Sequence, residues 1–427
     1  MGKIGLATMK LLIFFPMADV TQPTVTTFWI KSLKVIPWIG LAGLVLIILV
    51  AAGFYAQLYR KADPYRSFAD YGGFKDYYAN YPPQEQLPTP REQELLKKYY
   101  PRLYTPQGYP GPIDFYRDYI AQGKLVDGEG ELVSNEVTPE LLNRYKNTRG
   151  IQFIHQDKGI RTTPAVYGRV DYDTLTITKD NQVQEYPFTY LSYHFVFRTS
   201  GLPAGMPKWQ TFFIDLFLSM KDWHQLDHYT AVTMILDEGE KPVAVMMQQH
   251  NYMTTYLIGQ DVELPSDKRV GIDVAIGSNE LYPHEPGRVK RRAASFLSPG
   301  IASYVILGGK KPLMAAEDVT EGVQEVAYNL EFLPQTDAFY LFTGRLGQLR
   351  YLPGRDGPPG SDYNTMPAIK PKAISMVYNY RGQNKEEYVQ LLEDTFQDIF
   401  SRRIKPEFVQ TFGERFVRDW EKVAGSE

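Results

Sequence analysis

The chain has 427 residues, 44% of them hydrophobic, which is enough apolar material for one large core or two modest ones. Its 46 basic and 49 acidic residues give a formal net charge of −3, and the lack of a basic field disfavours nucleic-acid binding. There is no cysteine, which excludes disulfides, thiolate metal ligands and a cysteine nucleophile.

An uncharged stretch over residues 35–59, VIPWIGLAGLVLIILVAAGFYAQLY, predicts a single transmembrane helix. About 20 apolar residues rising about 1.5 Å each are enough to cross a hydrocarbon core of about 30 Å. A cleaved signal peptide is the alternative, because Ala56 offers a small-residue cleavage site. With the anchor, residues 1–34 form a short cytoplasmic tail and the main domain is extracytoplasmic, which places the protein in the inner membrane as a single-pass protein.

Residues 60–112 form a neck rich in tyrosine and proline, including DPYRSFADYGGFKDYYANYPP. Prolines at this density oppose helices and central strands, so we expect an extended segment that packs along the domain. Within it, Pro90–Tyr99 (PREQELLKKY) predicts a short helix with proline at its start.

Residues 113–380 read as β structure, with short runs of valine, isoleucine, tyrosine and phenylalanine bounded by turn residues. The sequence DEGEKP, between Leu236 and Val243, predicts a hairpin loop. Further strands are expected at EVAYNLEFL (325–333) and AFYLFTG (338–344). The predicted fold class is mainly β: a two-layer antiparallel β-sandwich with peripheral helices, preceded by the transmembrane helix.

Residues 381–427 predict a pair of helices with apolar stripes. The second stripe, beyond a proline, consists of Phe408, Phe412, Phe416 and Trp420. We expect these stripes to contact the core. A helix that lies on the bilayer or binds a partner helix is the alternative.

The segment WHQLDHYTAVTMILD places two histidines, His224 and His228, four residues apart. On a helix they would share one face, but a strand begins immediately after them, and the glutamate of a zinc-protease motif is missing. A serine hydrolase is also disfavoured because Ser278 lies in IGSNE, without a nucleophile elbow.

The order of several segments resembles a known superfamily. YYPRLYTPQGYPGP, YPFTYLSYHFVF, WHQLDHYTAVTMILD, PVAVMMQQH and VGIDVAIGSNELYPHEPG follow one another, with FTGRLG and GRDGPPG after them. This order is similar to that of the necrosis- and ethylene-inducing-like proteins and the related vacuolar-sorting-like domains, and it extends roughly from Tyr99 to Gly360. Each motif is degenerate, and the likeness lies mainly in their order.

The resemblance implies a divalent-cation site at His224 and Asp227, and an additional acidic ligand could come from Asp215 or Asp222 nearby in the sequence. The family's glutamate is replaced by Tyr229, which removes an oxygen ligand that Mg²⁺ or Ca²⁺ would favour and makes zinc a better fit. The alternative is a structural remnant that kept the turn and lost the metal. No cofactor beyond this one divalent metal is expected.

A second candidate surface is the loop GSNELYPHEPG with the basic run behind it, which could bind lipid phosphates or acidic glycans. In the resemblance His250 occupies the family's Gln-His position, and Asn279 replaces the histidine of its Gly-Ser-His turn. The candidate ligand-binding residues are His250, Asn279, Tyr282, His284, Arg288, Lys290, Arg291 and Arg292.

Two functions follow from these patterns. The first is a membrane-anchored extracytoplasmic protein without chemistry of its own, which binds an envelope partner (a protein, lipid headgroup or glycan) and in one version is an accessory subunit of a membrane complex. The second is a metal-dependent hydrolase that acts on an envelope glycan or lipid. The lack of a concentrated set of carboxylates and histidines favours the first.

Overall fold

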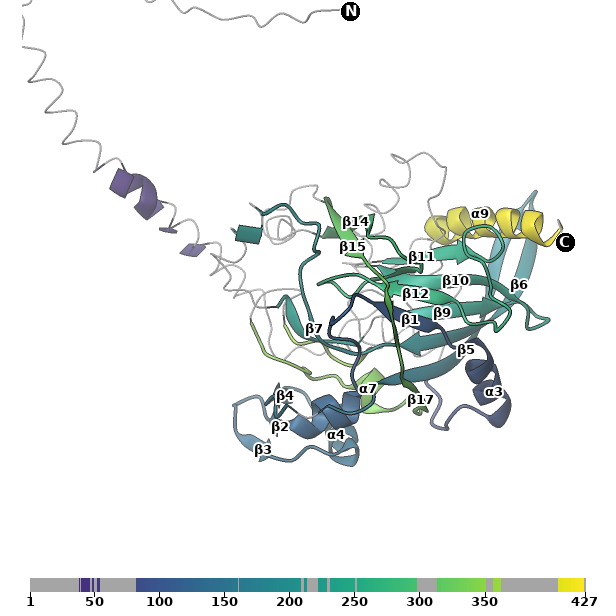
Figure 1. Ribbon diagram of the computed structural model, residues 1–427. Helices are drawn as coiled ribbons and strands as arrows, with labels where there is room; N and C mark the ends of the chain where they lie inside the picture. The colour runs from purple at the N-terminus through teal and green to yellow at the C-terminus, as the bar shows by residue number, and fades with distance from the viewer. Residues whose placement is uncertain are drawn as a thin grey trace, which may run out of the picture. The chain divides into compact units, whose positions relative to one another are not determined.

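The computed structural model describes residues 38, 40–46, 48–49, 52–53, 82–159, 161–208, 211–212, 222–228, 231–249, 252–297, 313–350, 356–361 and 406–425. The chain forms two compact units, Met1–Gln57 and Leu58–Glu427. The second unit contains every named strand and helix of the fold (Figure 1).

The described residues of the first unit, which include 40–46, are helical. The remaining residues of 35–59 lie outside the described part of the chain. Across the described residues, no helix combines the length and the apolar character that a membrane crossing requires. The predicted transmembrane helix at 35–59 is therefore wrong, and so are the single-pass and inner-membrane placements that rested on it.

The largest sheet of the second unit has six strands in the order β11-β10-β9-β6-β5-β17 (Figure 1). The strands β9 and β10 are joined by a tight turn in which the Asp237 amide donates to the Lys241 carbonyl, at 3.0 Å. The hairpin predicted at DEGEKP is thus confirmed. The strands are β5 (Ala165–Lys179), β6 (Gln182–His194), β9 (Ala231–Leu236), β10 (Pro242–Gln249), β11 (Tyr252–Leu257) and β17 (Asn329–Phe332).

A four-stranded sheet, ordered β13-β12-β1-β16, packs against one face of the large sheet. Its central pair, β1 and β12, is parallel, with Leu103 beside Ile272. Leu103 and Ile272 are fully buried and share a core with Leu191 and Met234 of the large sheet. The strands are β1 (Arg102–Thr105), β12 (Gly271–Val274), β13 (Leu281–Pro283) and β16 (Gln324–Val326).

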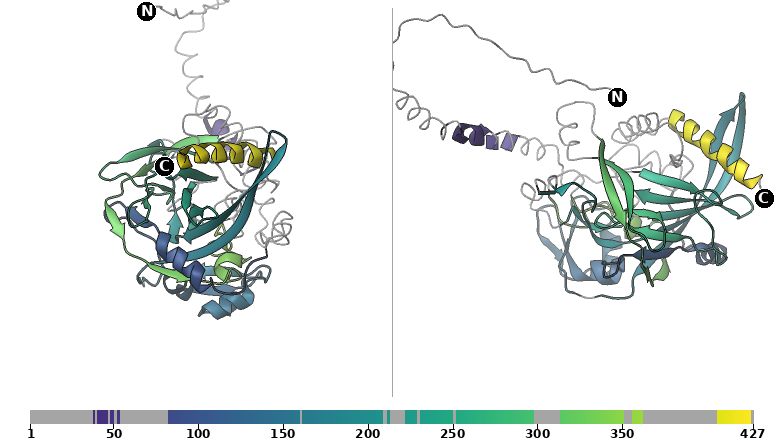
Figure 2. Two further views of the ribbon diagram at one scale, coloured as in Figure 1. Left: turned by 90° about the vertical axis from the view of Figure 1, so that its right-hand side faces the viewer. Right: turned by 45° about the horizontal axis from the view of Figure 1, so that its top comes forward.

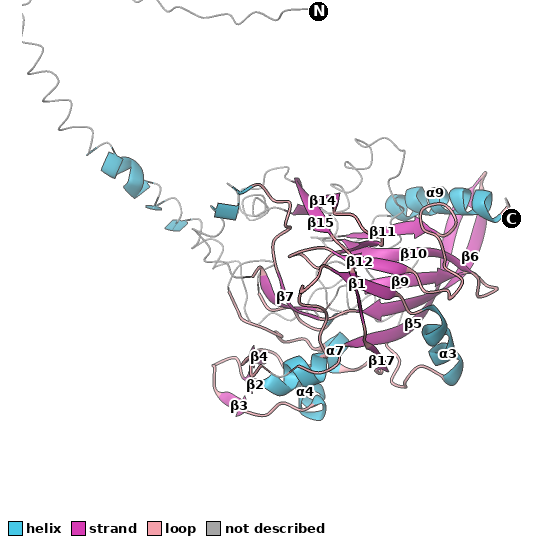
Figure 3. Ribbon diagram, in the orientation of Figure 1, coloured by secondary structure: helices cyan, strands magenta, loops and turns pink. Residues whose placement is uncertain are grey.

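A second core lies on the opposite face of β5. Because side chains alternate along a strand, Val166 and Val170 enter the first core, while Ala165 and Tyr167 enter the second. Short elements cover this second core (Figure 3). They are a π-helical turn (Phe115–Tyr119), a 3₁₀ turn (Ile120–Gln122), β2 (Gly123–Val126), β3 (Leu132–Ser134), α4 (Pro139–Tyr145), β4 (Gln152–His155) and α7 (Ala338–Leu341).

The fold is mainly β, but its architecture corrects the expected one. The strands β3, β2 and β4 form a three-stranded sheet, and two two-stranded sheets complete the described part, so the β structure is divided among five sheets. They pair β7 (Phe197–Ser200) with β8 (His224–Asp227), and β14 (Lys290–Leu297) with β15 (Leu313–Thr320). A single two-layer sandwich behind a membrane helix does not describe this chain, because β5 contributes to two cores.

Local signals differ in how well they predict the helices. The helix α3, Pro90–Tyr99, is confirmed: Thr89 and Glu92 form a capping box at its start. The strand expected at 338–344 is wrong, because Ala338–Leu341 is the short helix α7, capped by Asp337. All four residues of α7 are buried, so its sequence shows no polar face that would reveal a helical period.

The C-terminal helix α9, Pro406–Ala424, lies across the outer end of the β5-β6 hairpin (Figure 2). Phe416 is fully buried and meets Phe188 of β6 edge to face, with ring centroids 5.8 Å apart. Gly413 lies close enough to Leu175 and Ile177 that an added methyl would approach each to 3.0 Å. Phe416 and Trp420 of the second predicted stripe thus contact the hairpin, while the side chains of Phe408 and Phe412 and the first helix of the expected pair, before residue 406, lie outside what the structure describes.

Candidate functional site

The predicted metal ligand His224 begins the short strand β8 and faces its own backbone. Its Nδ1 donates to the Leu226 carbonyl at 3.1 Å, and Leu226 has a positive φ of 56°. The ring therefore stabilises a strained local turn. Its side chain is 5% exposed, so the histidine is part of the interior rather than of a solvent-facing site.

Asp227, the second predicted ligand, is also buried, and one of its oxygens accepts a hydrogen bond from the Asn279 side-chain amide at 2.9 Å. Asp215 lies outside the described residues. Over the ranges that the structure describes, no group of three histidine, aspartate or glutamate side chains could hold a metal ion. Among the described residues, His224 and Asp227 thus form hydrogen bonds that stabilise the local structure.

Asn279 is the centre of the polar loop 276–280, which leads into β13. It adopts a φ of +62°, a conformation that asparagine tolerates better than most residues. Its side chain donates to the Thr199 carbonyl at 2.8 Å and accepts from the Tyr109 hydroxyl at 3.0 Å. Tyr109 in turn accepts from the Gly277 amide at 2.8 Å, and burial raises the pKa of Tyr109 to about 12. This predicted residue therefore joins three segments of the chain.

A second buried carboxylate, Asp318 of β15, holds the other side of this loop. The Ser278 hydroxyl donates to one Asp318 oxygen at 2.7 Å, and the Tyr282 hydroxyl donates to the other at 2.6 Å. Asp318 is fully buried, so these hydrogen bonds replace water that a carboxylate would otherwise need. The loop is consequently fixed between two sheets.

His284 lies on the outer face of the four-stranded sheet. In the register of β12 and β13, Asp273 is opposite Tyr282, while Ile272 and Val274 point into the core. His284 Nδ1 is 2.6 Å from an oxygen of the fully buried Asp273, whose pKa is raised by burial and lowered again, to a smaller extent, by its bond to His284. The imidazole stacks on Tyr104 of β1, with centroids 3.7 Å apart and planes 9° apart. We call Arg102, Tyr104 and His284, which keep some exposure on this side of the sheet, the His284 face; Asp273 and Tyr282 lie on the same side but are buried.

The basic run next to the His284 face is largely paired with acidic side chains. Lys290 and Arg292 both contact Glu285, at 2.6 and 2.8 Å. Arg291 contacts Glu317 at 2.8 Å. Only Arg288 of the four predicted cations makes no ion pair within the described chain. Two carboxylates therefore offset half of the four cationic charges, which reduces the positive potential that lipid phosphates would meet.

Two further histidines are buried in the second core. His228 is 1% exposed, stacks beside Phe115, and makes no hydrogen bond of normal geometry through either nitrogen among the described residues. Burial, with smaller contributions from the neighbouring imidazoles of His194 and His224, lowers the pKa of His228 to about 3. His155 accepts from Arg198 at 2.6 Å, and burial together with that cation lowers the pKa of His155 to about 4.

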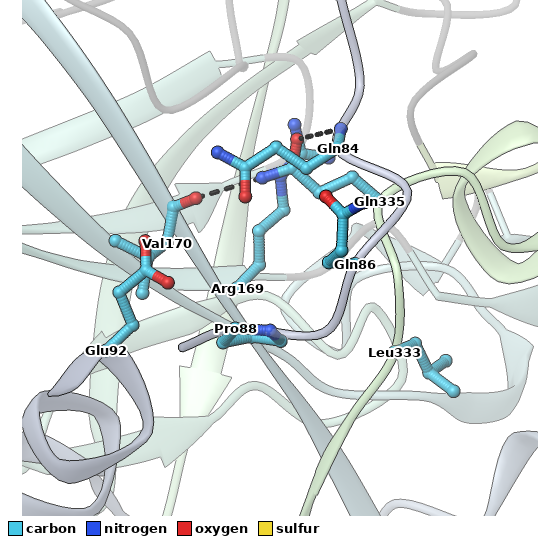
Figure 4. A pocket seen from close by; sticks show the side chains of 8 residues that line it. All are labelled: Gln84, Gln86, Pro88, Glu92, Arg169, Val170, Leu333 and Gln335. Atoms are coloured by element: carbon cyan, nitrogen blue, oxygen red, sulfur yellow. Dashed lines mark hydrogen bonds between the residues drawn. The ribbon is translucent and has the colours of Figure 1, made fainter. Parts of the chain in front are cut away.

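A small hollow lies elsewhere, where the segment before α3 crosses β5 (Figure 4). Its polar walls are already internally bonded: Gln335 donates to the Val170 carbonyl at 2.9 Å and accepts from the Gln84 amide at 3.2 Å. The buried guanidinium of Arg169 is held by Asp171 through two contacts, at 2.9 and 3.0 Å. The enclosed space has room for about one water molecule, which is too little for a substrate.

The structure unites some predicted site residues and separates others. Asn279, Tyr282 and His284 lie on one loop and strand, while His224 belongs to the interior and His250 lies outside the described residues. Sequence reasoning missed Tyr104, Asp273 and Asp318. Asp273 carried a usable signal, because it interrupts the apolar run VGIDVAI at a position that alternation places on the outer face.

Comparison with models of known families, with curated proteins and with solved structures finds no match for this chain. The resemblance to the necrosis- and ethylene-inducing-like proteins thus stays a prediction.

Proposed function

We propose that the chain is a binding protein and that the His284 face contacts a partner protein. The observation that carries this proposal is an aromatic and charged surface whose side chains are already fixed by partners within the chain. Tyr104 and His284 are stacked, and Arg102 is paired with Asp267. Tyrosine and arginine are the residue types most enriched at the energetic centres of protein interfaces.

The balance of charge favours a protein over a lipid surface or an acidic glycan. An anionic membrane would have to compete with Glu285 and Glu317 for the lysine and arginines that they contact. A protein surface of mixed charge can instead pair with both signs at once. We therefore expect a partner whose contacting surface is polar and close to neutral.

The test uses a photo-crosslinking amino acid at Glu325, which lies next to Tyr104 in the sheet and has a 46% exposed side chain. We expect one crosslinked partner in cells, lost when Arg102→Glu or His284→Ala is added to the same chain. A crosslinker at Gln260, an exposed residue of a distant turn, is the matched control. The purified partner should then bind the full chain with little change between about 0.05 and 0.5 M salt. Equal crosslinking from Gln260, or no effect of the face variants, contradicts the proposal.

Anionic vesicles supply the competing outcome. If vesicles rich in phosphatidylserine bind the full chain, and if that binding falls steeply with salt and with Arg288→Glu, the surface recognises lipid and the protein-binding proposal is wrong.

A further inference from the structure

The contact between Asp273 and His284 fixes which nitrogen of the imidazole carries hydrogen. Asp273 is fully buried and 2.6 Å from Nδ1 of His284, and its other oxygen accepts the Glu285 amide at 3.2 Å. A carboxylate can only accept, so Nδ1 carries the hydrogen and the lone pair of the neutral ring is on Nε2. The ring thus presents a proton acceptor on its far side.

Two glycines make room for this pair. A methyl group at Gly322 would lie 1.9 Å from the Asp273 carboxylate and 3.0 Å from Nδ1 of His284. At Gly271 it would lie 2.8 Å from the His284 Cβ. The backbone therefore approaches both members of the pair where no other residue would fit, and the stacked ring of Tyr104 limits rotation of the imidazole.

The acceptor nitrogen is available. His284 Nε2 makes no hydrogen bond within the described residues, and the side chain is 17% exposed. The other described histidines are more enclosed or already bonded: His224 and His228 are buried, and His155 accepts from Arg198. His284 therefore combines a fixed tautomer, an oriented ring and an Nε2 atom without a hydrogen-bond partner among the described residues, on a side chain that is 17% exposed; general bases need a free nitrogen held in this way.

We propose that Asp273 and His284 form an acid–base centre that hydrolyses a neutral acyl ester. Among the described residues His284 contacts no serine or threonine hydroxyl, so water is the nucleophile. Nε2 takes a proton from water as its oxygen bonds to the ester carbonyl carbon, and Asp273 stabilises the imidazolium. The carbon–alkoxide bond then breaks as Nε2 returns the proton to the leaving oxygen, giving one carboxylic acid and one alcohol.

The charges around the centre favour a neutral ester over a phosphoester. The nearby cations Lys290 and Arg292 are held by Glu285, so they are not free to neutralise the several charged oxygens of a phosphoryl group. Hydrolysis of an acyl ester develops charge on a single oxygen. This inference goes beyond the proposed protein-binding function and does not depend on it.

The first test measures how fast the His284 imidazole reacts with an acylating reagent. Full-length protein is treated with diethylpyrocarbonate, and carbethoxylation is followed by mass spectrometry. We expect His284 to react faster than the buried histidines His194, His224 and His228, and we expect Asp273→Asn to slow it. A rate at His284 no faster than theirs, in the folded chain, would falsify the assignment of an accessible Nε2.

The second test measures hydrolysis of p-nitrophenyl acetate by the full chain. We expect turnover that is slower in D₂O and that falls by about 10²-fold or more in His284→Gln. Gly322→Ala should lower the turnover rate, because the added methyl would displace Asp273 and His284. Gly111→Ala should leave the turnover rate unchanged, because the added methyl meets only ordinary contacts at 3.7 Å. Turnover in the parent chain equal to that of His284→Gln would overturn the proposal, as would a burst with a stable acyl-imidazole.

Discussion

The side-chain amide of Asn279 donates to the carboxylate of Asp227, 52 residues earlier in the chain, at 2.9 Å. This hydrogen bond joins the strand β8 to the loop beside the His284 face. It also connects two residues that the sequence had placed in separate candidate sites. The carboxylate that resembled a metal ligand thus positions a loop.

Replacing Asn279 tests the importance of this connection. Asn279→Ala removes one donor from Asp227, one acceptor from Tyr109 and one donor to a backbone carbonyl, all in a buried setting. We expect the free energy of unfolding to fall by about 2–3 kcal/mol, as measured in urea. Asn181→Ala is the control, since Asn181 has a similar φ of 63° but lies exposed at the hairpin tip. Equal losses in both variants would show that backbone strain alone explains the effect.

Removing the Tyr282 hydroxyl should lower the free energy of unfolding in the same way, but by less. Tyr282→Phe removes the 2.6 Å hydrogen bond to Asp318 and keeps the ring under Arg292, whose guanidinium carbon lies 5.5 Å from the ring centroid. We expect a loss of about 1–3 kcal/mol in thermal or urea unfolding. Ser278→Ala should cost a comparable amount. If the double variant costs no more than either single one, the two hydroxyls act as one unit on Asp318.

Acid should destabilise the second core through its buried histidines. The unfolded chain gains a proton on His228 below its ordinary pKa of 6.5, whereas the folded chain resists protonation until about pH 3. Between these values the unfolded state binds more protons, so stability is fully present above about pH 6.5 and falls as the pH drops toward 3. His155, with a pKa of about 4, acts in the same direction. Unfolding free energies measured from pH 7 to 4 should therefore decline.

The variant His228→Phe separates this contribution from the titration of carboxylates. Phenylalanine keeps the aromatic contacts with Phe115 and Phe339 but cannot take up a proton. We expect the decline in stability between pH 6.5 and 4 to become shallower by about 1.4 kcal/mol per pH unit at most. An unchanged slope would show that His228 does not resist protonation in the folded state.

The contact between α9 and the hairpin predicts a local effect on stability. Phe416→Ala removes a fully buried ring that packs on Phe188 and Trp420, at a cost of about 3–5 kcal/mol to the docked helix. Hydrogen exchange should then speed up in residues 174–188 of the hairpin tip and remain slow at β9. Lys422→Ala, on an exposed side chain, is the control. Uniform acceleration throughout the chain would mean that the helix is not a separate cooperative unit.

Local chemistry accounts for the parts of the fold that could be predicted. The capping box of Thr89 and the turn after Leu236 each lie within a few residues, and both were readable in the sequence. The short helix α7 was missed because every residue in it is buried, so strand and helix patterns look alike. The transmembrane helix predicted at 35–59 was wrong because the prediction rested on hydrophobic content, which alone does not establish a membrane-crossing helix.

The candidate site was predicted only in part because its partners come from distant segments. Tyr282 and His284 lie close together in sequence and were identified together. Tyr104 joins them only through the parallel pairing of β1 with β12, and Asp318 only through the position of β15. A single sequence does not reveal that pairing, so the ring of Tyr104 that stacks on His284 could not be named in advance.

The parallel pairing of β1 with β12 also constrains the order of events on the ribosome. Leu103 and its neighbour Ile272 are roughly 170 residues apart, so the first strand of the small sheet waits for its partner during about 10–30 s of synthesis. Throughout that interval β1 lacks its parallel neighbour, although strands of the large sheet that share its core have already been made. The small sheet is therefore completed only after most of the large sheet has been synthesised.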